Sequence, residues 1–181
     1  NELISANPQI NNPAFIIPGQ MINIPNIIPS TPSIPSTPST PTMPTTPSTP
    51  SNLSSEVSEV IRLVNAEREK AGVPALVENK KLSEVAQTKA NDFIDNNYFS
   101  HNSPTYGTPF NMIKNFGINF SAAAENIASG QKNASEVMNT WMNSSGHRAN
   151  ILNPTYNQIG VGVAKDKNGK LYWTQMFIKS A

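Results

Sequence analysis

The two histidines of the chain are the residues whose side chains are best suited to metal or acid–base chemistry. His101 lies in the segment FSHNSP and His147 in SGHRANIL, and the 181 residues contain no other histidine. A neutral imidazole is a good zinc ligand and titrates near neutral pH. About 46 positions separate the two residues, too many for a local metal motif, so only the fold can bring them together.

The hydrophobic pattern predicts four helices ahead of Pro154, because apolar residues recur three or four positions apart. They cover residues 54–71, 80–96, 108–117 and 133–145. Ser54 or Ser55 is the expected N-cap of the first helix, the second follows Asn79, and Thr108 and Asn133 are the expected N-caps of the third and fourth. His101 follows the second helix, and His147 follows the fourth in a turn or short helix.

Two strands close the sequence. Residues 158–165 and 171–178 alternate in the manner of strands, and DKNGK between them predicts a hairpin with Asn168 and Gly169 as the positive-φ pair. Helices followed by an antiparallel hairpin predict an α+β domain, with a sheet covered by helices.

An almost uncharged tail precedes this domain. Residues 1–53 carry one charged side chain, Glu2, whereas residues 54–181 carry all 13 basic and the other 11 acidic side chains. Proline occupies every third position from 29 to 50, which predicts a polyproline II spacer of about 65 Å.

The expected organisation therefore has three parts. Residues 1–28 form an Ile/Asn/Pro-rich segment, which we expect to be sticky and to dock on its own domain or a neighbour. Residues 29–53 form a Pro/Ser/Thr-rich linker, and residues 54–181 form the folded domain. A domain of about 128 residues can bury a core without disulfides.

Composition excludes several classes of protein. A net charge of +1 without a basic stripe argues against nucleic-acid binding. No run of about 18 apolar residues is present, so no transmembrane segment is expected. The absence of cysteine means that stability does not depend on disulfides, and the chain begins with Asn1 rather than Met, which predicts a removed leader.

Four pieces of sequence together resemble a known family. FSHNSP, AENIASG, a tryptophan six residues before HRANIL, and IGVGVA followed by YWTQMF occur in this order over about residues 55–179. They resemble the CAP superfamily (cysteine-rich secretory proteins, antigen 5 and pathogenesis-related proteins) in its bacterial extracellular, SCP-like branch. The resemblance implies an α-β-α sandwich with a central antiparallel sheet and a surface groove, preceded here by a disordered or polyproline II tail.

The resemblance also implies a site in the groove. It carries two histidines and one glutamate onto His101, Glu125 and His147, with the histidines as zinc ligands. The second glutamate of the family falls at Ser144, so this corner departs from the pattern. A site with two imidazoles is expected to bind zinc weakly and to discriminate poorly against copper or nickel.

Glu125 has three alternative roles on chemical grounds. It could be a third metal ligand, an acceptor that fixes the tautomer of a histidine, or the base for a water. Ser103 or Ser144 would be a nucleophile only in a hydrolase, and the chain has no G-x-S-x-G elbow. Whether the protein is an enzyme stays open at this point.

Three functions follow as hypotheses. The leading one is a secreted or surface-associated binding module whose groove takes a divalent metal and a lipid, sterol or peptide. The alternative is a metal-dependent, peptidase-like hydrolase of extracellular or envelope material, with Glu125 as its candidate catalytic base. The third is a wall- or spore-associated structural protein with a vestigial groove. Association with a cell wall or envelope would use the N-terminal tail or non-covalent contacts.

Overall fold

The structure of the protein is a computed structural model that describes residues 51–181, with side chains from Leu53 onward. The predictions for the segment 1–28 and for most of the linker 29–53 lie outside the described residues. The first helix begins at Ser51, three residues before the predicted start of the domain.

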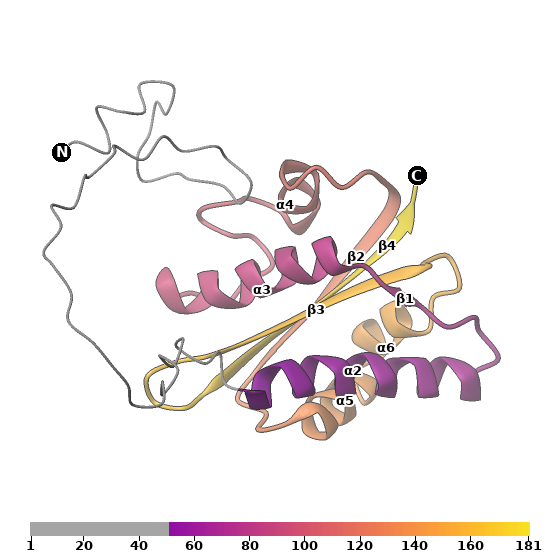
Figure 1. Ribbon diagram of the computed structural model, residues 1–181, viewed down its shortest axis with the longest axis horizontal. Coiled ribbons are helices and arrows are strands. Elements are labelled where there is room, and N and C mark those ends of the chain that lie inside the picture. The colour runs from indigo at the N-terminus through magenta and orange to yellow at the C-terminus, as the bar shows by residue number, and fades with distance from the viewer. Residues whose placement is uncertain (1–50) are drawn as a thin grey trace, which may run out of the picture. The chain divides into compact units, whose positions relative to one another are not determined.

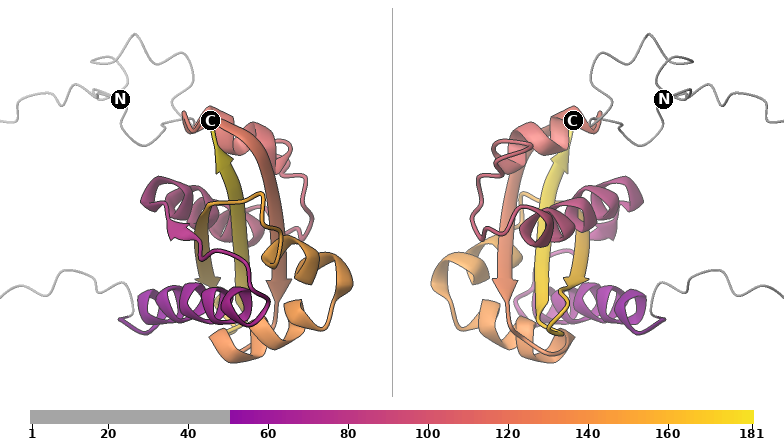
Figure 2. Two further views of the ribbon diagram at one scale, coloured as in Figure 1. Left: turned by 90° about the vertical axis from the view of Figure 1, so that its right-hand side faces the viewer. Right: turned by 90° about the vertical axis from the view of Figure 1, so that its left-hand side faces the viewer.

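A four-stranded sheet forms the middle layer, with the strand order β1-β3-β4-β2. The strands are β1 (Val77–Glu78), β2 (Phe120–Ser129), β3 (Gln158–Lys165) and β4 (Leu171–Ser180). The three long strands run antiparallel side by side (Figure 2), and the two-residue β1 pairs in parallel with β3. The sheet is therefore antiparallel except at one short edge.

Helices cover both faces of this sheet (Figure 1). On one face lie α3 (Lys80–Asp95) and α4 (Pro109–Asn115). On the other lie α2 (Ser51–Lys70) and α5 (Ala134–Met142), and α6 (Ser145–Ile151) contacts β2 and adds Ile151 to the same core. The predicted α-β-α sandwich with a central, mainly antiparallel sheet is confirmed.

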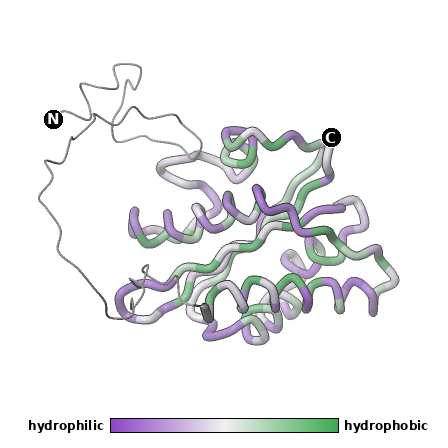
Figure 3. Tube along the Cα trace, viewed as in Figure 1, coloured by the Kyte–Doolittle hydropathy of each residue, from purple (hydrophilic) through white to green (hydrophobic). Residues whose placement is uncertain are grey.

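Alternation along β4 divides the core between the two faces. Trp173 and Phe177 pack with α2 and α5, whereas Met176 and Ile178 pack with α3 and α4. This is the period of two that a strand imposes on its side chains. The hydrophobic stretches along β3 and β4 are visible in Figure 3.

Two glycines of β3 allow α3 to lie unusually close to the sheet. A Cβ atom at Gly160 would lie 2.3 Å from the main chain of Leu82, and one at Gly162 would lie 2.3 Å from that of Gln87. Any larger residue would push the helix away. The Gln87 side chain also bonds to the main-chain N–H and C=O of Val163, which closes the open edge of β3.

The N-caps predicted at Thr108 and Asn133 are confirmed, and the second helix follows Asn79 as predicted, but the N-cap predicted at Ser54 or Ser55 is wrong because α2 already begins at Ser51. Asn79 accepts from the N–H of Leu82 at 3.0 Å, and Thr108 and Asn133 cap α4 and α5 in the same way. The hairpin prediction is wrong in one detail, because Gly169 has a φ of +84° but Asn168 does not have a positive φ. Asp166 accepts instead from the N–H groups of Asn168 and Lys170, which turns the chain without a second positive φ.

The sequence pattern does not predict β1 or β2. Three consecutive alanines, Ala122 to Ala124, precede Glu125 and Asn126 in β2, and these residue types have low strand propensity. Pairing with β4 makes the segment a strand, so tertiary context overrides local preference here. Among residues 51–181, no helix is long and apolar enough to cross a membrane.

Candidate functional site

A direct contact joins His101 to Glu125. His101 lies in the loop after α3, and its Nδ1 atom is 2.7 Å from Oε1 of Glu125. The Glu125 side chain is 1% exposed and that of His101 is 56% exposed, so the carboxylate is buried beneath an imidazole that lies at the protein surface. Because Glu125 occupies Nδ1, Nε2 is the ring nitrogen of His101 that is available to a ligand.

Burial shifts the protonation of Glu125. Loss of solvent raises the pKa of its carboxyl group, and this effect outweighs the hydrogen bond from His101 and the charges of Lys89 and His101, which lower it. The second carboxylate oxygen, Oε2, is buried and has no hydrogen-bond partner in the protein. Glu125 thus has one oxygen fixed by His101 and one free.

His147 is the third residue of α6, beside the edge strand β2. Its Nδ1 atom is buried without a hydrogen-bond partner. Burial lowers the pKa of His147, and the positive charge of a protonated His101 lowers it further. His147 is therefore held in the neutral form that binds metals.

The two serines considered as candidate nucleophiles, Ser144 and Ser103, make no contact with either histidine side chain among the hydrogen bonds of the described residues. Ser144 is the N-cap of α6 by its main chain, and its side chain makes no capping bond. Its role in the groove stays a prediction. Ser103 is buried, donates to Asp92 at 2.7 Å and accepts two main-chain N–H groups, so its hydroxyl is not available as a nucleophile.

A buried lysine that the sequence pattern does not reveal contacts the main chain of His101. Lys89 is 0% exposed and donates from Nζ to the hydroxyl of Tyr98 at 3.0 Å, to the carbonyl of Ser100 at 3.0 Å and to that of His101 at 2.8 Å. Burial lowers its pKa, against the charges of Glu125 and Asp92. Position 89 lies on the apolar stripe of α3, and a lysine there is the signal that could have revealed it.

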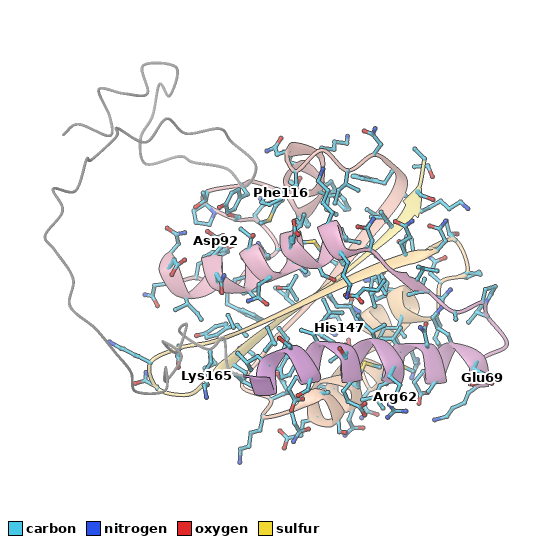
Figure 4. The ribbon with its side chains drawn as sticks, viewed as in Figure 1. Arg62, Glu69, Asp92, Phe116, His147 and Lys165 are labelled. Atoms are coloured by element: carbon cyan, nitrogen blue, oxygen red, sulfur yellow. The ribbon has the colours of Figure 1, made fainter. Side chains whose placement is uncertain are left out.

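Asp92, also on α3 (Figure 4), completes this buried polar cluster. It accepts from the hydroxyl groups of Tyr98 and Ser103, on either side of His101 in the sequence. Burial, followed by the hydrogen bond to Asp92, raises the pKa of Tyr98, so the phenol stays protonated and donating. The loop that carries His101 is therefore fastened to α3 at both ends.

Asn126 plays a comparable part next to His147, which Figure 4 also labels. Its side chain is 0% exposed and donates to the main-chain carbonyl of His147 at 3.1 Å and to Oε1 of Gln175 at 3.0 Å. It also accepts from the amide of Asn150 at 2.9 Å. The helix that carries His147 is thus tied to strand β2.

The donor set limits which metal sites the residues fit. Within residues 51–181, no group of three His, Cys, Asp or Glu is arranged to hold a metal ion. A closed structural zinc site, which needs four protein ligands, does not fit. An open site completed by water or a ligand would have to use the two imidazoles, through Nε2 of His101 and the unpaired, buried Nδ1 of His147.

Comparison with known proteins identifies the family. Residues 61–177 match the model of the cysteine-rich secretory protein family, CAP. The chain belongs to this family.

It is 52% identical over 118 residues to YkwD of Bacillus subtilis (strain 168), covering 65% of this chain and 45% of YkwD. The membrane protein YlbC of the same organism is 38% identical over 117 residues, covering 65% of this chain and 32% of YlbC. The chain spans less than half the length of these relatives.

Solved structures show the same fold. An extracellular protein with an SCP domain from Bacillus anthracis matches with a TM-score of 0.68 and 33% identity, covering 75% of this chain and 45% of that one. An outer surface protein of Borrelia burgdorferi matches with a TM-score of 0.66 and 23% identity, covering 70% of this chain and 94% of that one. These similar structures are extracellular or surface proteins.

Proposed function

We propose that the protein is an extracellular or surface-associated binding module whose site takes up a divalent metal, zinc in the first instance, between His101 and His147. The observation that carries the proposal is the 2.7 Å contact between Nδ1 of His101 and Oε1 of Glu125. Carboxylate–histidine pairs of this kind orient a zinc ligand and fix its tautomer.

Of the three roles open to Glu125, this geometry favours the orienting acceptor. Its Oε1 holds Nδ1–H of His101, which turns Nε2 toward the exposed side of the ring. Neutral His147 supplies the second nitrogen, Nδ1, which has no partner inside the protein. A bound zinc ion would supply Lewis-acid polarisation of an oxygen ligand.

The test is a calorimetric titration of zinc into the full chain, with the His101→Ala/His147→Ala double variant alongside. We expect binding near one equivalent in the wild type and none in the folded double variant. Equal binding by both proteins would mean that zinc sits elsewhere, and no binding by either would refute the metal proposal. Copper and nickel titrations would measure the selectivity of a site with two nitrogens.

An exposed aromatic side chain close to His101 in the sequence supports a lipid, sterol or peptide as a further ligand. Phe99, two residues before His101, is 47% exposed and contacts the rings of Phe93 at 5.1 Å and Tyr172 at 6.3 Å. An apolar ligand portion could pack on this surface while a polar end lies at His101. Loss of binding of such a ligand in Phe99→Ala, at unchanged zinc affinity, would support this arrangement.

A metal-dependent hydrolase is the second candidate, and the raised pKa of Glu125 favours it. A carboxyl group with a raised pKa is a better general base than an ordinary one, and Oε2 is free of other bonds. Peptidase or envelope-degrading activity that disappears on chelation and in Glu125→Gln would establish it. Zinc binding without any such activity would leave the binding module.

Attachment to a cell wall or envelope is the part we propose for the N-terminal tail. The extracellular and surface placement of the similar structures supports an exported protein. The proline repeat between residues 29 and 50 supports a spacer that holds the domain away from its anchor point. Binding of the full chain to purified walls, compared with a chain lacking residues 1–28, tests this role directly.

A further inference from the structure

Each histidine of the site has its own main-chain carbonyl held by a fully buried side chain. Lys89 donates to the carbonyl of His101 at 2.8 Å, and Asn126 donates to that of His147 at 3.1 Å. Both donors are 0% exposed. We propose that Lys89 and Asn126 are positioning residues, each of which sets the place of one histidine. Only the expected effect on metal affinity rests on the proposed function.

All the hydrogen bonds of the Lys89 ammonium are directed at one loop. Its three acceptors are the hydroxyl of Tyr98 and the carbonyls of Ser100 and His101, all in the loop after α3. Burying an ammonium group is costly unless its hydrogens are bonded. An apolar residue at position 89 would fill the stripe of α3 at lower cost, so the lysine is best explained by what it holds.

The carboxylate of Asp92 fastens the same loop at two further points. It accepts from Tyr98 and Ser103, and Asn96 donates to it at 2.6 Å. His101 lies between Tyr98 and Ser103 in the sequence, and Lys89 donates to its main-chain carbonyl. The loop main chain is therefore fixed on both sides of the histidine, and Glu125 then fixes the ring.

Asn126 holds α6 by two residues that share one helix face. It donates to the carbonyl of His147 and accepts from the side chain of Asn150, three positions further along. Contacts one turn apart fix both the distance of the helix from β2 and its rotation. Oε1 of Gln175 on the neighbouring strand accepts from the same amide nitrogen of Asn126. The direction of the His147 ring follows from that rotation.

The test uses the fact that the chain contains two histidines, which give two sets of imidazole signals in NMR spectra of the full-length, metal-free, histidine-labelled protein. We expect Lys89→Met to move the signals of His101 much more than those of His147. Asn126→Ala should do the reverse. A general loss of stability would not produce this opposite selectivity.

Asn65→Ala is the matched control. Asn65 of α2 bonds both main-chain groups of Leu76, at 2.8 and 3.0 Å, in another part of the fold. We expect this variant to lower the melting temperature and to leave both histidines unchanged. If Lys89→Met or Asn126→Ala does not fold, Lys89→Arg, which keeps the charge, and Asn126→Ser, which keeps a small polar group, should show the same selectivity.

A folded variant that moves neither histidine, or moves both equally, would overturn the proposal. Zinc affinity is then measured in the same variants, and we expect the Kd to rise about 10- to 100-fold, as for other residues that orient metal ligands. If the wild type binds no zinc, the proposed function fails, but the imidazole signals still decide the positioning roles.

Discussion

Glu125 and Asn126 are neighbours on the edge strand β2, and their side chains leave the sheet on opposite faces to hold the two histidines. Glu125 binds the ring of His101, and Asn126 binds the main chain of His147. The alternation of a β-strand makes this arrangement possible with two consecutive residues. One short stretch of strand therefore sets the relative position of segments that are about 46 residues apart in sequence.

Replacing Glu125 by glutamine should change how stability depends on pH. The folded state raises the pKa of this carboxyl group above its ordinary value of 4.5, so above that value the folded state binds more protons than the unfolded state. The contribution of Glu125 to the free energy of unfolding is therefore fully present at low pH and is lost as pH rises through its pKa in the folded state. We expect Glu125→Gln to gain stability relative to wild type between about pH 4 and 7, measured by urea unfolding. A constant difference across this range would contradict the raised pKa.

His147 should act in the opposite direction and at higher pH. The folded state lowers its pKa below the ordinary value of 6.5, so the unfolded state binds more protons there. The contribution of His147 to the free energy of unfolding is present above pH 6.5 and is lost as pH falls through its pKa in the folded state. In metal-free buffer, His147→Gln should therefore lose less stability than wild type on acidification from about pH 7 to 5. If stability falls with pH in the same way for both proteins, the pKa of His147 is not shifted in the folded state.

Arg68 should be among the most sensitive positions for stability. It is 0% exposed, and its guanidinium donates to the carbonyls of Pro74, Ile151, Asn153 and Tyr156. Arg68→Met would leave these carbonyls without their donor, and we expect a loss of about 3 kcal/mol or more in the free energy of unfolding.

Arg62, on the same helix, is the control for this variant. Its ion pair with Glu59 joins side chains that are 63% and 39% exposed. Water screens exposed pairs of this kind, which add little to stability, so Arg62→Met should be nearly neutral. Equal losses for the two variants, measured in the same chemical unfolding experiment, would argue that the buried contacts of Arg68 carry no special weight.

Gly162→Ala should destabilise the protein through the contact between α3 and β3. The added methyl carbon would lie 2.3 Å from the main chain of Gln87, so the helix would have to move away from the sheet. Overpacking of this kind costs about 1–3 kcal/mol. Gly146→Ala is the control, because a Cβ there meets nothing within 4 Å. Thermal unfolding that ranks the two variants equally would contradict this account of the interface.

Local sequence signals predict the positions of the helices and several of their ends, because the determinants are local. Thr108 and Asn133 each cap a helix as expected, and Gly72 and Gly117 end α2 and α4 with positive φ values, but α2 begins three residues early and α5 ends at Met142 rather than at 145. These features depend on a few neighbouring residues and on backbone geometry. The strands of the closing hairpin are predicted for the same reason.

The missed features depend on contacts between distant segments. Strand β2 is rich in alanine and becomes a strand only by pairing with β4. Lys89 and Asp92 lie on the buried stripe of α3, where the pattern leads one to expect apolar residues, and their partners lie in the following loop. No local rule assigns Asn126 to the carbonyl of His147, since α6 reaches it only in the folded chain.

The most direct test of the account is a zinc titration of the full chain that is followed through the imidazole signals of its two histidines. We expect the signals of His101 and His147 to change together and both changes to be complete near one equivalent of zinc. A titration in which only one histidine responds, or in which the two respond at different zinc concentrations, would contradict a single site built from both residues.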